Sequence, residues 1–342
     1  MNKEYFDKWA KEVAPKNGVE IVKSLVYGTY YKINDARSAV YEIVWQGHKL
    51  LGILKLFDDP RITYEIGAHQ AFNAVNKSQI LRAPKIIHSE QITPHKGWIL
   101  MEKIPDGYKQ LPQPLPKEKR YEFLKLYGEY KRNAPKRPHR PLTLEEKLSA
   151  EKFHLSRILG RWLRLANDKQ EKEQVNYLDR AFCRLFENAL DAIEAEFKGR
   201  KMIWSVHGLF KPEDIFEVER QGKKEYYLID FCRAGMHPQG YELSTIVWAD
   251  WIISADWRMS YLSWVKGIED WRKKIMEWNF KQPSAHRKNA KNLKKLLEVC
   301  LIERILGTIL ADVCASDRPK EEKEARLSYL IKYLNEIIKN TG

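Results

Sequence analysis

The chain has 342 residues, of which 44% are hydrophobic and 31% are charged, and it carries a formal net charge of +14. Its apolar content is ample for a packed core, which excludes a disordered chain, and its length suits one large unit or two lobes. The positive charge favours anionic partners such as nucleotides, nucleic acid or an anionic membrane surface. A solvated, lysine-rich surface explains the same charge equally well.

The cysteines and the apolar runs predict a reduced, cytoplasmic protein. The spacing of the four cysteines fits neither a disulfide framework nor a zinc site: Cys183, Cys232, Cys300 and Cys314. The first six residues lack the apolar region of a signal peptide. The longest apolar run, 246–253, is interrupted by Asp250 and is too short to span a bilayer.

The first 107 residues show mainly the alternation that is typical of strands. A short amphipathic helix is predicted over 3–13, and a second helix over 62–72 follows an Asp-Asp-Pro sequence that favours helix initiation. The predicted strands lie near 19–31, 40–45, 50–57, 86–87 and 98–101. We therefore expect an antiparallel sheet of five strands with one main helix.

A helical region follows a break at Pro105-Asp106-Gly107 and a proline-rich linker, 108–118. The predicted helices cover 121–131, 144–167, 177–197, 244–281, 288–313 and 320–339. Between the first two, the prolines and positive charges of 131–141 predict an exposed loop. The chain is thus expected to divide into an N-lobe, 1–107, and a helical C-lobe, 119–342.

The segment 206–235 is the most informative part of the C-lobe. A charged loop from His207 to Asp214 separates two apolar runs, and the second of these runs ends in Ile229-Asp230-Phe231. Such a loop delivers polar groups to the mouth of a sheet. That is a suitable place for a phosphate and a metal ion.

This segment resembles the catalytic region of a known superfamily. His207-Gly208-Leu209-Phe210-Lys211-Pro212-Glu213-Asp214-Ile215 is similar to the H-R-D-L-K-P-E-N-I loop of protein kinases and to the H-G-D-x-x-x-x-N loop of aminoglycoside and choline phosphotransferases. Leu228-Ile229-Asp230-Phe231 resembles their metal-binding D-F-G or I-D-F/W segment, and Gly240-Tyr241-Glu242-Leu243-Ser244 resembles the helix start that follows it. The resemblance implies an α+β, protein-kinase-like bilobal fold, with a small antiparallel β-sheet N-lobe, one main N-lobe helix and a large, mostly helical C-lobe.

Segments upstream match the same superfamily in the same order. Gly52-Ile53-Leu54-Lys55 is similar to the V-A-I-K strand whose lysine binds the α- and β-phosphates of ATP, and Glu65 is implied as the ion-pair partner of that lysine. Residues 98–107 resemble the strand and hinge that bind adenine. In that register the gatekeeper, and the two residues whose backbones face the base, are Met101, Glu102 and Ile104.

Three positions depart from the family pattern. Leu209 occupies the place of the aspartate that accepts the substrate proton, and a leucine can neither accept a proton nor orient a hydroxyl. Asp214 replaces the asparagine that is the second metal ligand, and its carboxylate can still hold Mg²⁺. The phosphate-covering loop, 32–39, contains no glycine, so Arg37 and Ser38 are its candidate phosphate contacts.

Each candidate residue also has a structural alternative. The Lys55 ammonium can reach the surface instead of a partner, and Asp230 and Asp214 suit a turn and a cap as well as a metal. Lys211 matches the lysine that protein kinases direct at the γ-phosphate, or it is a surface lysine. The resemblance implies that His207 braces the loop and is no base.

Two main hypotheses follow, with a weaker third. The first is a pseudokinase-like protein that binds Mg-ATP or another nucleotide through Lys55, Glu65, Asp214 and Asp230, and acts as a binding or regulatory module. The second is a working phosphotransferase on a small-molecule or lipid-headgroup hydroxyl, in which Lys211 stabilises the γ-phosphoryl group and a water or a substrate acid takes the proton. The third is nucleic-acid binding by the basic surface.

Overall fold

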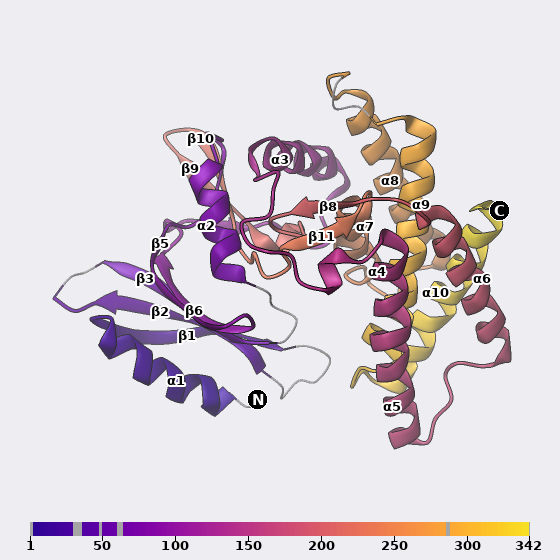
Figure 1. The fold of residues 1–342 in the computed structure, drawn as a ribbon, viewed down its shortest axis with the longest axis horizontal. Helices are drawn as coiled ribbons and strands as arrows, with labels where there is room; N and C mark the ends of the chain where they lie inside the picture. The colour runs from indigo at the N-terminus through magenta and orange to yellow at the C-terminus, as the bar shows by residue number, and fades with distance from the viewer. Residues whose placement is uncertain (1–2, 30–35, 48–49, 60–63, 285–287, 342) are drawn as a thin grey trace.

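The computed structural model describes residues 3–29, 36–47, 50–59, 64–284 and 288–341. It has two lobes. Figure 1 shows the N-lobe, a sheet with helices α1 and α2, on the left and the mostly helical C-lobe on the right. This is the expected bilobal protein-kinase-like architecture. No helix in the described ranges is both long enough and apolar enough to cross a membrane.

The N-lobe is built on one antiparallel sheet, as predicted. Its strand order is β1-β2-β3-β6-β5, with bounds Val19–Thr29, Ala36–Trp45, Leu51–Asp58, Lys96–Glu102 and Ile86–Thr93. The predicted extension of the first strand to 31 lies outside the described residues. Helix α1, Lys3–Lys16, packs on one face of the sheet, and α2, Glu65–Val75, contacts β5.

Side-chain alternation along β3 decides which residues face each helix. Leu54 and Leu56 are fully buried in the cluster that contains Phe6 of α1. Phe57 belongs to a different cluster, which contains Ile66 of α2. Because successive side chains of a strand point to opposite faces, position 55 shares the face of Phe57, towards α2.

Two small sheets lie in the C-lobe and were only partly expected. The predicted hairpin is formed by β9, Ile215–Arg220, and β10, Lys223–Leu228. Two-residue strands flank it on either side: β4, Leu81–Arg82, pairs in parallel with β10, and β7, Lys109–Gln110, pairs with β9. A separate pair joins β8 to β11, with bounds Met202–Ser205 and Gly235–Pro238. The N-lobe chain and the linker therefore each contribute a strand to the hairpin sheet.

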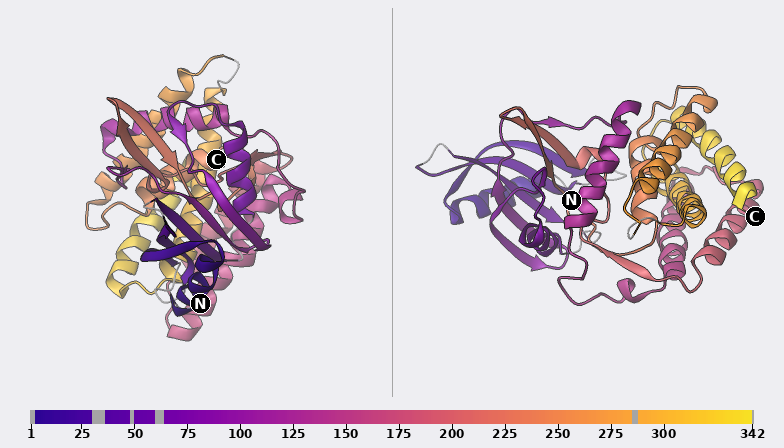
Figure 2. Two further views of the ribbon diagram at one scale, coloured as in Figure 1. Left: turned by 90° about the vertical axis from the view of Figure 1, so that its left-hand side faces the viewer. Right: turned by 90° about the horizontal axis from the view of Figure 1, so that it is seen from above.

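Helices make up the rest of the C-lobe, and Figure 2 shows them gathered at the end of the molecule opposite the N-lobe sheet. The α-helices are α3, Arg120–Asn133; α4, Ala150–Arg157; α5, Arg164–Glu173; α6, Arg180–Phe197; α7, Tyr241–Val247; α8, Tyr261–Phe280; α9, Ala290–Gly307; and α10, Lys320–Thr341. Three π-helical segments continue α4, α7 and α9: η3, Ile158–Leu163; η5, Trp248–Ile252; and η6, Thr308–Cys314. Short 3₁₀ turns are η1, Lys117–Lys119; η2, Glu145–Lys147; and η4, Pro212–Asp214.

Two of the predicted helices are wrong in their extent. The helix expected over 244–281 is two helices, because the side chain of Ser260 accepts a hydrogen bond from the backbone N–H of Ser263 and starts α8 anew. The helix expected from residue 144 begins at Ala150, after Ser149 caps it in the same way. N-capping by serine therefore outweighed the longer apolar periodicity.

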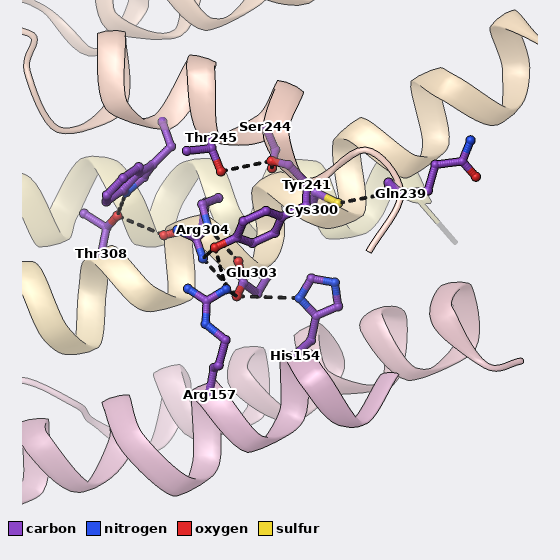
Figure 3. Close-up of polar contacts among 11 residues, drawn as sticks. His154, Arg157, Gln239, Tyr241, Ser244, Thr245, Cys300, Glu303, Arg304 and Thr308 are labelled. Carbon is purple, nitrogen blue, oxygen red and sulfur yellow. Dashed lines mark hydrogen bonds and ion pairs between the residues drawn. The ribbon is translucent and has the colours of Figure 1, made fainter. Parts of the chain in front are cut away.

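A buried ionic network joins α4, α7 and α9 (Figure 3). The Glu303 carboxylate lies 3.3 Å from Arg157 and 2.7 Å from Arg304, and the Tyr241 hydroxyl accepts hydrogen bonds from both guanidinium groups. Burial alone would raise the pKa of Glu303, but the two arginines hold it below its usual range. Tyr241 also stacks on His237 of β11 at 4.9 Å, so the network anchors the strand that follows Asp230.

Candidate active site

Lys55 forms the centre of a charged group between the lobes. Its ammonium lies 2.5 Å from Glu65 Oε1 on α2 and 2.9 Å from Asp230 Oδ1 after β10. Its side chain is only 12% exposed, so it does not extend into solvent. Burial would lower the pKa of Lys55, but the charges of Asp230 and Glu65 raise it well above its ordinary value. The structure therefore brings together three of the predicted site residues.

Asp230 is held in an unusual backbone conformation. Its φ of 64° lies in the left-handed region, which costs a residue with a side chain about 1–3 kcal/mol. Burial would raise the pKa of Asp230, but the charges of Lys55 and Lys211 outweigh it and keep the group ionised. Asp230 is therefore ionised, which a carboxylate must be to bind a cation.

Asp214 and Lys211 form a second pair at the start of β9. The Lys211 ammonium lies 3.3 Å from Asp214 Oδ1 and also contacts the carboxylate of Glu213. It is 15% exposed, so Lys211 is no surface lysine. Asp214 is buried, which raises its pKa, and its Oδ2 has no hydrogen-bond partner among the described residues. An unsatisfied buried carboxylate oxygen is costly unless a ligand completes it.

His207 braces the loop between these pairs. Its Nε2 lies 2.8 Å from the carbonyl oxygen of Ile229, and its backbone N–H donates to the Tyr130 hydroxyl at 3.1 Å. Burial lowers the pKa of His207 to about 4, so the ring is neutral at pH 7. Phe231 packs against the same ring at 5.2 Å and stacks on His69 of α2 at 4.7 Å. These contacts join the loop, the Asp230 segment and α2.

Gly208 and Leu209 occupy the turn of the loop. Gly208 has φ 74°, and a Cβ built on it would lie 1.8 Å from the carbonyl oxygen of Arg233, so no other residue fits. Leu209, which the sequence resemblance aligns with the family's proton acceptor, is half-buried. The nearest carboxylates in the loop, Glu213 and Asp214, are both in contact with Lys211.

The predicted hinge lies at the edge of the same region. Met101 is buried in a cluster with Phe57, Ile66 and Cys232, and Cys232 follows Asp230 by two residues in the chain. The backbone N–H of Glu102 donates to the carbonyl oxygen of Lys85 at 3.0 Å. Ile104 follows as a partly buried residue after the end of β6.

The predicted phosphate-covering loop is only partly described. Residues 32–35 lie outside the described ranges, whereas Arg37 and Ser38 are partly buried residues of β2. Ser38 faces Gly28 of β1, where a Cβ would lie 2.3 Å from the Ser38 Oγ. Gly28 thus leaves the space that the Ser38 side chain occupies, a close approach between the two strands. An isolated glycine inside a strand pattern was the signal that could have identified it.

The prediction of an exposed loop over 131–141 is wrong at Arg140, whose side chain is nearly buried. The Arg140 guanidinium lies 4.5 Å from the Tyr64 ring, next to Glu65, and 5.8 Å from the Trp204 ring. It also donates to both oxygens of Glu146 at 2.7 and 2.8 Å, and both side chains of this pair are about 10% exposed, at 8% and 11%. A neutralised charge and two aromatic faces made burial of this loop favourable.

Asp214 and Asp230 are the two carboxylates of this region that could hold a magnesium ion. Within the described ranges, no three His, Cys, Asp or Glu side chains form a group able to hold a metal ion alone. Magnesium, however, is commonly held by one or two carboxylates together with substrate phosphates and waters. The unpartnered Oδ2 of Asp214 and the ionised Asp230 meet that requirement.

Comparison with solved structures supports the same architecture. The chain is similar to a thermostable mutant of the aminoglycoside phosphotransferase APH(4)-Ia in complex with ADP and hygromycin B, with a TM-score of 0.59, 10% identity and 97% of each chain covered. A microcompartment-associated aminopropanol kinase gives a TM-score of 0.61 at 12% identity, with 99% of each chain covered. The fold is that of protein-kinase-like small-molecule kinases.

A third kinase of a small molecule shares this fold. An ethanolamine kinase from Plasmodium vivax gives a TM-score of 0.53 at 10% identity, covering 98% of this chain and 87% of that one. No family model matches the sequence, and no curated protein matches it either. At such low identities the likeness is one of fold, and the chemistry must be argued from this chain's own residues.

Proposed function

We propose that this chain binds a magnesium nucleotide between its lobes and that Leu209 impairs phosphoryl transfer from it. The observation that supports binding is the position of Lys55, whose ammonium contacts Glu65 and Asp230 at once. In kinase-like folds this arrangement orients a lysine towards phosphates and a carboxylate towards the metal. This arrangement supports a phosphate site between the lobes. Leu209 leaves that site without a side-chain base.

Different candidate residues are proposed to contact different parts of the magnesium nucleotide. Lys55 neutralises phosphate oxygens, and Glu65 fixes its position from α2. Asp214 and Asp230 would hold Mg²⁺, which would supply positive charge to neutralise the phosphates. The backbone after Met101, at Glu102 and Ile104, is proposed to face the base, and Arg37 and Ser38 to contact the phosphates.

Impairment is argued from the chemistry of Leu209. General acid–base catalysis contributes about 10²–10⁴-fold to a reaction rate, and a leucine side chain cannot supply it. Glu213 and Asp214 are unsuited to replace it, because both contact the Lys211 ammonium. The chain would then act as a nucleotide-dependent binding or regulatory module.

A second candidate is an active phosphotransferase on a hydroxyl of a small molecule or lipid headgroup. Lys211 favours it, because Asp214 and Asp230 raise the pKa of this buried lysine and keep it charged despite the cost of burial. A fixed positive charge beside the metal ligands would stabilise the transferring phosphoryl group. Transfer is mainly positioning and charge stabilisation, so a water or a substrate acid could accept the proton.

Nucleotide binding is tested by titrating the wild-type chain with a fluorescent ATP analogue in magnesium. Saturable binding is expected, and Asp230→Asn should weaken it at least tenfold in magnesium but much less in EDTA. The control is Lys23→Ala, which removes one exposed lysine of β1 and should bind as the wild type does. Absence of binding to the folded wild type would refute the proposal.

Transfer is tested separately, with radiolabelled ATP and a panel of amino alcohols, aminoglycosides and lipid headgroups. Labelling of a panel member by the wild type, lost in Lys211→Ala, would select the second candidate. A silent panel together with saturable nucleotide binding would select the first.

A further inference from the structure

A small pocket opens in the C-lobe between α3, β8, β11 and α7. Its polar lining consists of Tyr127, Lys131, Ser205, His237, Glu242 and Lys288. None of these residues belongs to the proposed nucleotide site. The cavity of about 30 Å³ has room for about two water-sized groups, which excludes a nucleoside and admits the oxygens of one small oxyanion at its mouth.

Glu242, the one carboxylate among the described lining residues, already has hydrogen-bond partners on both oxygens. One oxygen of Glu242 accepts from Ser205 Oγ at 2.5 Å, and the other accepts from the Lys131 ammonium at 2.7 Å and from the Tyr127 hydroxyl at 3.2 Å. Burial would raise the pKa of Glu242, but Lys131 and Ser205 lower it to about 2. Glu242 is therefore ionised and has little capacity left to neutralise another cation.

Lys288 adds a second cation to the wall without a carboxylate of its own. It is partly buried, and within the described part of the chain no carboxylate forms an ion pair with it. Burial and the charge of Lys131 lower the pKa of Lys288, and Glu242 offsets only part of this effect. Burial and the charge of Lys131 also lower the pKa of Lys136, and Glu242 offsets part of this effect. Lys131, Lys136 and Lys288 thus all lie near the Glu242 carboxylate.

We propose that this pocket binds a small oxyanion of the phosphate class between Lys131 and Lys288. An anion would neutralise the excess charge and would offset the cost of burying Lys288. The cations that line the pocket include two lysines, Lys131 and Lys288, which bind phosphate as point charges. The Ser205 hydroxyl donates its proton to Glu242, so the two ammonium groups supply the contacts to the anion.

Occupancy of this pocket connects directly to the catalytic-type loop. The Ser205 Oγ that donates to Glu242 also accepts a hydrogen bond from the backbone N–H of Gly208 at 2.9 Å. An anion that attracts Lys131 away from Glu242 would loosen the carboxylate and, through Ser205, the turn at Gly208. The pocket is therefore a site through which a phosphate compound would act on the loop.

Calorimetric titration with inorganic phosphate at low ionic strength tests the site. The wild type is expected to bind one phosphate, Lys288→Ala at least tenfold more weakly, and Lys288→Arg with affinity largely restored. Lys291→Ala removes an exposed lysine from the first turn of α9 and should leave the affinity unchanged. Lys131 is left intact because its removal would strand the buried Glu242.

Three results would overturn the proposal. The first is no binding of phosphate by the wild type at tens of millimolar. The second is the same phosphate affinity in Lys288→Ala as in the wild type. The third is the same affinity of the wild type for acetate as for phosphate, which would contradict the phosphate class. Hydrogen exchange at Gly208 should accelerate with phosphate in the wild type and not in Lys288→Ala. Lys55→Ala should leave phosphate binding at this pocket intact. Failure of the pocket proposal and failure of the nucleotide proposal can therefore be told apart.

Discussion

The guanidinium of Arg140 lies 4.5 Å from the centroid of the Tyr64 ring, so a loop of the C-lobe contacts the first residue before α2. The next residue, Glu65, is the partner of Lys55. In kinase-like folds the position of this helix decides whether the lysine–glutamate pair can form. The loop between α3 and α4 therefore contacts the segment that carries Glu65 of the proposed nucleotide site.

Arg140→Ala should loosen α2. Removing the guanidinium leaves Glu146 nearly buried without its partner, and loss of such a pair costs about 3 kcal/mol. We expect faster hydrogen exchange over α2 and nucleotide affinity reduced about threefold to tenfold, each measured on folded protein. Arg137→Ala, an exposed position of the same loop, is the control and should change neither quantity. Unchanged exchange in Arg140→Ala would show that the loop does not position the helix.

Leu209→Asp should raise the rate of phosphoryl transfer from bound ATP to water or to a substrate. It places a proton acceptor where the family has one, and such a group contributes about 10²–10⁴-fold. Leu209→Asn has a similar shape without the basic carboxylate and should remain at the wild-type rate. The readout is phosphate release with nucleotide binding measured in parallel. Equal rates in the two variants would show that the missing aspartate does not limit turnover.

Gly208→Ala should destabilise the fold more than Gly222→Ala. Both glycines have positive φ, 74° and 72°, so both substitutions carry the cost of a left-handed backbone, about 1–2 kcal/mol. A Cβ at Gly208 would also lie 1.8 Å from the carbonyl oxygen of Arg233, whereas nothing lies within 4 Å of one at Gly222. Urea denaturation of both variants isolates the steric contribution. Equal losses of stability would mean that the loop shifts without cost.

Asp250 should make stability fall as the pH rises from about 4 to about 6. It is fully buried, which raises its pKa to about 6, although the backbone N–H of Leu115 and the Trp271 indole donate to it. Between 3.8, the value for a solvated carboxyl, and about 6, the folded state holds a proton that the unfolded state has released. Stability must therefore decrease across this window, by up to about 3 kcal/mol.

The measurement is urea denaturation at several pH values, with Asp250→Asn compared with the wild type. The difference in unfolding free energy between the two should shift in favour of the variant as the pH rises through the window. Asp191→Asn, at an exposed position, should run parallel to the wild type. Parallel curves for Asp250→Asn would show that Asp250 is ionised throughout.

The sequence by itself determined the fold class and which residues to consider for the site. The strand alternation around Lys55 and the loop from His207 to Asp214 are local patterns, because backbone periodicity and short motifs depend on neighbouring residues. The structure confirmed the five-stranded sheet and placed Lys55, Glu65 and Asp230 in contact. It also confirmed the hairpin between Asp214 and Asp230. The functional roles of these residues stay predictions.

Only the tertiary structure decided which partners the remaining charges take. Lys131 and Glu242 are 111 residues apart, and Arg140 reaches the ring of Tyr64 across the lobes. The sequence made this loop look like a solvated insertion, because a charged residue reads as exposed until its neutralising partner is known. Lys288 is the opposite case. The sequence does not reveal that it is partly buried without an ion-pair carboxylate among the described residues, because that depends on which segments pack around it.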